Sequence, residues 1–173
     1  TQVLETKRYS EIIMTRVTVP VGEDIGFLPG TEEEKMQPWM GALEDNLEFL
    51  NSGIHTEAGD WDRSASKEFI KSHIKVKSLN FMRGRTFLNK FLIIDEAQNL
   101  TPKQMKTLIT RAGPGTKIVC LGNIAQIDTP YLTEGSSGLT YVVDRFKGWP
   151  HSGHITLHRG ERSRLADYAN EAL

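Results

Sequence analysis

The chain has 173 residues, 38% of them hydrophobic and 25% charged, so it is long enough for one globular domain and unlike a disordered tail. Its 21 basic and 22 acidic side chains give a formal charge of -1, so only a local basic cluster could indicate binding to nucleic acid or a membrane. The single cysteine excludes an internal disulfide and fits a reducing cytoplasm, and no segment reaches the ~18–20 apolar residues that span a bilayer.

Short β-branched runs alternate with helix-like stretches along the chain, which favours parallel βαβ units. In the first half, the pattern predicts a strand over residues 12–19 and a turn-rich loop over residues 21–30. A helix or helix pair over residues 32–50 comes next. A short helix over residues 67–74 and a strand over residues 74–79 complete this half.

The second half carries the clearest strand, at residues 91–94, where four consecutive apolar residues suggest a central strand buried on both faces. A helix start follows, because Thr101 can cap, Pro102 suits the first helical position and Gln104 lies three residues after the cap. We expect that helix to run to about Arg111. The remaining expected elements are a strand at 117–121, a helix at 137–146, a strand at 154–157, and a helix at Arg164–Ala172 that Ser163 can cap. Cys120 lies in the apolar run 118–121, which favours a buried small side chain over a reactive thiol.

Two adjacent carboxylates, Asp95 and Glu96, follow the buried strand directly. Ligands of open α/β sheets bind beyond the carboxyl ends of the strands, where both acids would lie. In phosphate-transfer sites an Asp at this position holds Mg²⁺, often through water, and the next acid is suited to orient the attacking water or accept its proton. The competing interpretation is that the two acids cap the helix region near Thr101 or face solvent.

Polar residues also follow the next strand, where Gly122 and Asn123 precede Gln126. An amide side chain there could donate to a γ-phosphate oxygen or orient a water without adding charge. The competing interpretation is a plain strand-to-helix turn, in which Gly and Asn are common. Further on, the arginine-rich segment 159–164 could stabilise charge on a transferring phosphoryl group, although a solvated helix start explains any single arginine there.

The phosphate-binding loop of such a site, G-x-x-x-x-G-K-[ST] between a strand and a helix, does not occur in the sequence. The glycine-rich stretch at 113–117 has the wrong spacing and precedes a strand. We therefore expect the loop to lie N-terminal to Thr1, in a part of a longer protein.

Several motifs together resemble the PhoH-like ATPases, relatives of the first lobe of superfamily-one helicases, over nearly the whole chain. These motifs are VGEDIGFLPG at 21–30, FMRGRT at 81–86, DEAQN at 95–99, GNIAQID at 122–128 and RSRL at 162–165. The stretch EEKMQPWM at 33–40 looks closest to the branch in which a PIN-type nuclease domain precedes the PhoH domain.

The resemblance implies a RecA-like, P-loop NTPase-type α/β fold with a parallel sheet flanked by helices, incomplete at its N-terminus. It implies a single domain over residues 1–173 with a helical insertion at about 32–74. The implied activity is hydrolysis of ATP with Mg²⁺, coupled to the unwinding or remodelling of RNA, in the cytoplasm and without a membrane partner. The other implied partners are an upstream region with the phosphate loop, which in the PIN-PhoH branch follows a PIN domain, and further copies of the chain in a homo-oligomeric ring.

By the same resemblance, Asp95 holds Mg²⁺, Glu96 is the catalytic acid, Gln126 is the sensor glutamine, and Arg162 reaches the γ-phosphate within the chain or across a ring of subunits. Many relatives carry Asp where this chain has Asn123, and the change removes a negative charge beside the metal site.

We expect Arg16, Arg83 and Arg85 to lie near single-stranded RNA. On an extended segment Arg83 and Arg85 would point to the same side, and bases could stack on an aromatic such as Phe81. Structural ion pairs with nearby acids are an equally good account of these arginines. With half of the nucleotide site missing, the chain could instead be a non-catalytic binding or assembly module of a larger RNA-processing protein.

Overall fold

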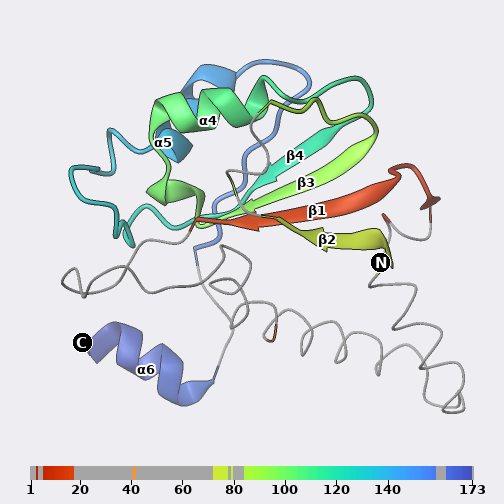
Figure 1. Cartoon of the computed structure of the whole chain (residues 1–173). Helices are drawn as coiled ribbons and strands as arrows, with labels where there is room; N and C mark the ends of the chain where they lie inside the picture. Colours follow the sequence, from red (N-terminus) through yellow and green to blue (C-terminus); the bar gives the residue numbers. More distant parts are fainter. Residues whose placement is uncertain are drawn as a thin grey trace, which may run out of the picture. The chain divides into compact units, whose positions relative to one another are not determined.

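A parallel sheet of four strands forms the centre of the described part of the unit Thr1–Val142. The computed structural model describes residues 3, 6–17, 41, 72–77, 79, 84–158 and 163–172. The strands are β1 (Glu11–Arg16), β2 (Ile74–Val76), β3 (Lys90–Asp95) and β4 (Lys117–Cys120), in the order β2-β1-β3-β4 (Figure 1). The expected α/β architecture with a parallel sheet is confirmed.

The apolar run predicted as the central strand is β3, and it pairs with β1 on one side and β4 on the other. Its residues Leu92 and Ile94 are fully buried. The register places Leu92 beside Ile13 of β1, and this row of apolar side chains lies on the face that the helices cover. The predicted strands at 12–19 and 74–79 are shorter in the structure: β1 ends at Arg16 and β2 at Val76.

The helix after β3 begins as its sequence predicts. A single 3-10 turn, η2 (Ala97–Asn99), precedes α4 (Pro102–Ile109). Thr101 caps α4 in a capping box: its hydroxyl accepts from the Gln104 backbone N–H at 3.2 Å, and the Gln104 side-chain oxygen accepts from the Thr101 N–H at 2.9 Å. The polar cap fixes where the helix starts, so Met105 and Leu108 face the sheet and are buried.

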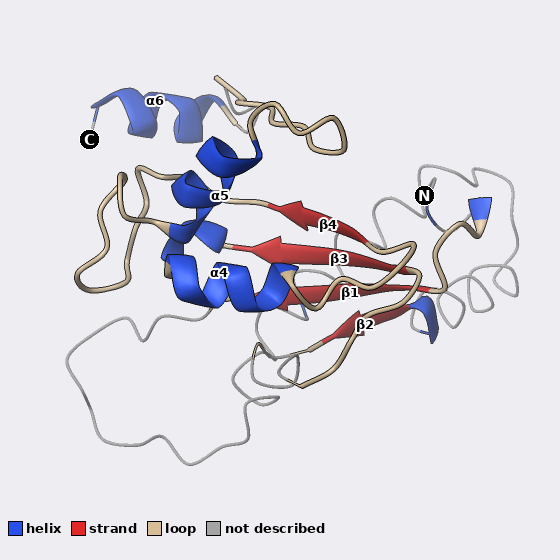
Figure 2. Cartoon of the chain, turned by 90° about the horizontal axis from the view of Figure 1, so that it is seen from above, coloured by secondary structure: helices blue, strands red, loops and turns tan. Residues whose placement is uncertain are grey.

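Helix α4 and the first turn of α5 (Gly138–Phe146) cover one face of the sheet (Figure 2). Leu139 and Val142 of α5 pack against the core. The buried core consists of Ile13, Phe87, Leu92, Ile94, Ala97, Leu100, Met105 and Leu108. This packing holds the carboxyl ends of β1, β3 and β4 in fixed positions, which matters for the polar residues that follow them.

The chain divides into two compact units, Thr1–Val142 and Val143–Leu173. In the second unit, α6 (Arg164–Ala172) has the predicted bounds. The predicted strand at 154–157 is wrong: the segment pairs with no strand of the described chain, and its Ile155 and Leu157 are 84% and 86% exposed. Its alternating pattern suits a strand, but a strand also needs a neighbour to bond its backbone.

The predicted helical insertion at about 32–74 falls almost wholly outside the described residues and stays a prediction, as does the single-domain organisation. Within the described ranges, no helix combines the length and apolar character that crossing a bilayer requires.

Gly138, the first residue of α5, allows a close approach between two backbone segments. A Cβ at this position would lie 2.7 Å from the carbonyl oxygen of Leu100 and 2.8 Å from that of Thr101, and the Gly138 N–H donates to Leu100 O at 2.7 Å. We expect Gly138→Ala to lower the free energy of unfolding by about 1–3 kcal/mol, since backbone atoms must move. Gly135→Ala, where a Cβ meets nothing within 4 Å, is the matched control. Equal urea midpoints for the two variants would contradict this account.

Cys120 at the end of β4 is partly buried and packs against the apolar core. Burial raises the pKa of its thiol from 9.0 to about 11. The thiol's contribution to stability is therefore complete below pH 9.0 and is lost as the pH rises through about 11. At pH 8 we expect a disulfide reagent to label Cys120 slowly in the folded protein and rapidly in urea, because the thiolate is the nucleophile. Rapid labelling of the folded protein at pH 8 would show that the thiol is accessible and ionised.

Candidate functional site

The candidate site lies at the carboxyl edge of the sheet, where β1 and β3 end side by side. The two strands are parallel, and their register pairs Arg16 with Asp95. The Val17 N–H continues this pairing by donating to the Asp95 carbonyl oxygen at 3.2 Å. Paired residues of a parallel sheet project to the same face, so the register alone places an arginine beside the first acid.

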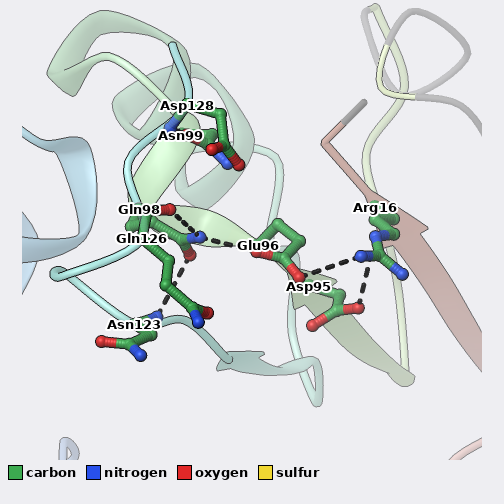
Figure 3. A network of polar contacts seen from close by, with 8 residues as sticks. All are labelled: Arg16, Asp95, Glu96, Gln98, Asn99, Asn123, Gln126 and Asp128. Carbon is green, nitrogen blue, oxygen red and sulfur yellow. Dashed lines mark hydrogen bonds and ion pairs between the residues drawn. The ribbon is translucent and has the colours of Figure 1, made fainter. Parts of the chain in front are cut away.

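Arg16 makes ion pairs with both acids (Figure 3). Its Nη2 donates to Glu96 Oε1 at 3.0 Å, and its Nε lies 3.9 Å from Asp95 Oδ2. The Arg16, Asp95 and Glu96 side chains are 36%, 26% and 29% exposed. The guanidinium thus offsets the repulsion between the two adjacent carboxylates at a place that water and ligands still reach.

Glu96 has a left-handed backbone conformation, with φ 53° and ψ 38°. For a residue other than glycine this costs about 1–3 kcal/mol, so neighbouring interactions must maintain it. The Ala97 N–H donates to the Leu121 carbonyl at 2.9 Å, and the Asn99 N–H donates to the Glu96 carbonyl at 3.0 Å. These bonds tie the turn after β3 to the end of β4, and the strained backbone at this point is typical of functional sites.

Gln98 is fully buried and connects Glu96 to the loop after β4. Its Nε2 donates to Glu96 Oε2 at 2.6 Å and to the Gln126 carbonyl oxygen at 2.8 Å, and its Oε1 accepts from the Asn123 N–H at 3.2 Å (Figure 3). Both amide hydrogens and the oxygen are therefore used. This pattern also settles the orientation of the amide, since only Nε2 can face two acceptors.

Gly122 leaves the space that the Gln98 amide occupies. A Cβ on Gly122 would lie 2.6 Å from Gln98 Oε1 and 3.1 Å from the Gln98 backbone nitrogen. A side chain at this position would displace the bridging amide, which explains the glycine two residues after the end of β4.

The two amides predicted as phosphate sensors have different surroundings. Asn123 closes its own turn, since its Oδ1 accepts from the Ala125 N–H at 3.0 Å and its carbonyl accepts from the Gln126 N–H at 3.0 Å. This is the turn that the competing interpretation predicts. The exposed side chain of Gln126 makes no hydrogen bond to the described residues, so it is available to a ligand.

Asn99 holds the far end of the same loop. Its Oδ1 accepts from the Asp128 N–H at 2.8 Å and from the Thr129 N–H at 3.1 Å, and the Thr129 hydroxyl donates to the Asn99 carbonyl at 2.8 Å. The sequence interpretation assigned roles to Asp95 and Glu96 but none to Gln98 and Asn99. Their signal is present in the sequence as two adjacent amides that are separated from the acid pair by one alanine, but only their burial shows that they position the site.

The structure brings together four of the predicted site residues: Asp95, Glu96, the backbone of Gln126, and Arg16. Arg85 is exposed and lies two residues before the buried Phe87. The other two predicted site residues, Arg83 and Arg162, lie outside the described residues.

Asp95 is the acid better placed to hold a cation. Its contact with Arg16 is the longer one, and its Oδ1 makes no hydrogen bond or ion pair with a described residue, whereas Glu96 uses both oxygens. No group of three or more His, Cys, Asp or Glu residues that could bind a metal occurs in the described ranges. One carboxylate with waters and phosphate oxygens is the donor set that Mg²⁺ takes in nucleotide sites, so Asp95 fits that ion.

The sequence matches the family model described as "PhoH-like protein" over residues 1–171. It is 50% identical to Protein PhoH2 of Bacillus subtilis over 165 residues, which cover 95% of this chain and 36% of that protein. It is 35% identical to Protein PhoH2 of Mycolicibacterium smegmatis over 173 residues, 99% of this chain and 37% of that protein. A PhoH-like protein of Bacillus subtilis is 38% identical over 145 residues, 84% of this chain and 42% of its own length.

The chain thus spans well under half the length of these relatives. Its parallel sheet with flanking helices agrees with the α/β, P-loop NTPase-like fold of the family. Family model, relatives and fold all lead to one assignment: the chain belongs to the PhoH-like protein family.

Proposed function

We propose that a protein carrying this chain hydrolyses ATP at the carboxyl edge of the sheet and uses the reaction to unwind or remodel RNA. One observation carries the proposal: Glu96 follows the buried strand β3, and a buried glutamine ties its carboxylate to the loop that carries Gln126. An acid and an amide held in a fixed relation are what the orientation of an attacking water requires.

Each residue of the edge has a distinct part in the proposed reaction. Asp95 would hold Mg²⁺ through its free oxygen, directly or through water; when bound, the ion neutralises charge on the phosphate oxygens. Glu96 orients the attacking water and accepts its proton. Gln126 donates from its exposed amide to a γ-phosphate oxygen. Gln98 positions both Glu96 and Gln126 without touching the nucleotide.

Two further components complete the proposed site. Because the chain covers only 36% of Protein PhoH2 of Bacillus subtilis, we propose that a segment outside these 173 residues supplies the phosphate loop, in some proteins next to a PIN domain. Arg162 would stabilise the charge that develops on the transferred phosphoryl group, either in its own chain or across a homo-oligomeric ring. We place the protein in the cytoplasm, where its single cysteine stays reduced.

Single-stranded RNA is the proposed second substrate, bound through Arg16, Arg83 and Arg85. Arginine side chains contact the phosphates of a nucleic acid backbone, so a few of them can bind RNA even though the protein as a whole is not strongly basic. The formal charge of -1 limits the contribution of long-range attraction, so these few local contacts must carry the affinity.

A non-catalytic binding or assembly module is the second candidate function. The observation in its favour is that both oxygens of Glu96 already accept hydrogen bonds, from Arg16 and from Gln98. A measurement of ATP turnover distinguishes the ATPase from the non-catalytic module.

Replacing the proposed catalytic acid tests the enzyme directly. In a protein that joins this chain to its phosphate loop, we expect Glu96→Gln to lower kcat for ATP about 10²–10⁴-fold, because the general base is lost while the shape is kept. The affinity for Mg²⁺-ATP should change little. Steady-state phosphate release and calorimetry measure the two quantities.

Glu134→Gln is the matched control for this experiment, since it makes the same change at an exposed acid of a loop. We expect it to leave kcat at the level of the unsubstituted protein. If turnover survives Glu96→Gln, Glu96 is not the catalytic acid. A complete absence of turnover in the unsubstituted protein would favour the binding module.

The RNA contacts predict a salt dependence. We expect the double variant Arg83→Ala, Arg85→Ala to bind single-stranded RNA more weakly and to lower the slope of log affinity against log salt by about 1 for each lost phosphate contact. The control is Lys103→Ala, Lys106→Ala, which removes the same charge from exposed positions of α4. Fluorescence anisotropy at several salt concentrations measures both. If the double variant binds RNA with unchanged affinity, Arg83 and Arg85 do not contact the RNA.

A further inference from the structure

Arg16 lies at a position where its ion pairs with Asp95 and Glu96 would compete with a phosphate of RNA for the same edge of the guanidinium. Its Nη2 donates to Glu96 Oε1 at 3.0 Å, yet its side chain is 36% exposed. The same guanidinium is a proposed contact for the phosphate backbone of RNA. Its Nε and Nη2 form the edge of the guanidinium that faces the two acids, so a phosphate bound along this edge would replace the carboxylates.

The contact with Arg16 restrains Glu96 from the side opposite to Gln98. Oε2 accepts from Gln98 at 2.6 Å, and Oε1 accepts from Arg16. Any water that Glu96 is to orient must share an oxygen with one of these donors. Gln98 is fully buried and uses all of its amide, so it cannot leave, whereas Arg16 is the exposed donor.

Arg16 and the amides of the loop after β4 lie on different sides of the two acids. Arg16 belongs to β1, whereas Asn123 and Gln126 follow β4, and β3 with its acids lies between these strands (Figure 3). A nucleotide phosphate contacted by Gln126 would lie on the β4 flank. The phosphate that engages Arg16 therefore comes from the β1 flank, which fits an RNA backbone better than the nucleotide itself.

We propose that Arg16 is a positioning residue that restrains Glu96 until a phosphodiester of single-stranded RNA draws the guanidinium away. Release of Oε1 then lets Glu96 orient the attacking water, so ATP hydrolysis depends on bound RNA. The proposal rests on the proposed function. An ion pair at this exposure is weak, because water screens it, so a phosphate can compete for Arg16.

Coupling of this kind is reciprocal, which gives a test without ATP turnover. In nucleotide-free buffer we expect Glu96→Gln to tighten binding of a single-stranded RNA roughly 3–10-fold, because Arg16 is no longer held by a carboxylate. In the double variant Arg16→Gln, Glu96→Gln the gain should disappear. Glu11→Gln is the matched control: Glu11 pairs with Lys90 at 3.0 Å on the same two strands, at the opposite edge of the sheet, and should leave RNA affinity unchanged.

The second readout is turnover in the protein that includes the phosphate loop. We expect Arg16→Gln to raise ATP hydrolysis without RNA about 5–20-fold and to reduce the stimulation by RNA toward one, as the loss of a 1–2 kcal/mol coupling predicts. A fall in RNA-free turnover would instead mean that Arg16 assists the nucleotide directly. That result would overturn the proposed release of Glu96 by RNA, which we call the Arg16 switch. Arg16→Lys keeps the charge, and thermal unfolding of both variants checks that they fold.

The outcomes separate the switch from the function on which it rests. If the unsubstituted protein hydrolyses ATP but Glu96→Gln leaves RNA affinity unchanged, the switch is wrong and the proposed function stands. If no ATP is hydrolysed at any RNA concentration, the proposed function fails and the switch fails with it. Tighter RNA binding by Glu96→Gln that requires Arg16, together with raised RNA-free turnover in Arg16→Gln, supports both.

Discussion

The buried amide of Gln98 is the interaction on which the rest of the site depends. It is fully buried and joins the acid after β3 to the loop after β4 through three hydrogen bonds. An amide buried without these partners would be costly, so the loop and Glu96 must adopt one relative position when the chain folds. Gly122 belongs to the same constraint, because any side chain there would take the space of the amide.

The parallel sheet supplies the second constraint. Since β1 and β3 run in the same direction and pair Arg16 with Asp95, the ends of both strands bring their polar residues to a single edge. The apolar core under α4 and α5 fixes that edge without contributing chemistry to it. Glu96 is thus held between a buried donor, Gln98, and an exposed one, Arg16, and in our proposal only the exposed donor releases its oxygen.

Local signals in the sequence predicted much of this arrangement. The four apolar residues at 91–94 predicted the central strand, and Thr101 with Gln104 predicted the start of α4. Asp95 and Glu96 lie at the strand end, as expected. The sequence pattern placed Arg16 with RNA and assigned nothing to Gln98 or Asn99. It also predicted a strand at 154–157 that has no partner among the described residues.

What the sequence determined by itself is therefore the set of elements whose causes lie within a few residues: apolar runs, helix caps and the acids that directly follow a strand. Only the tertiary structure decided which side chains meet. Arg16 and Glu96 are 80 residues apart, and Gln98 and Gln126 are 28 apart. Such contacts depend on strand register and burial, and both arise from packing between distant segments that no local pattern records.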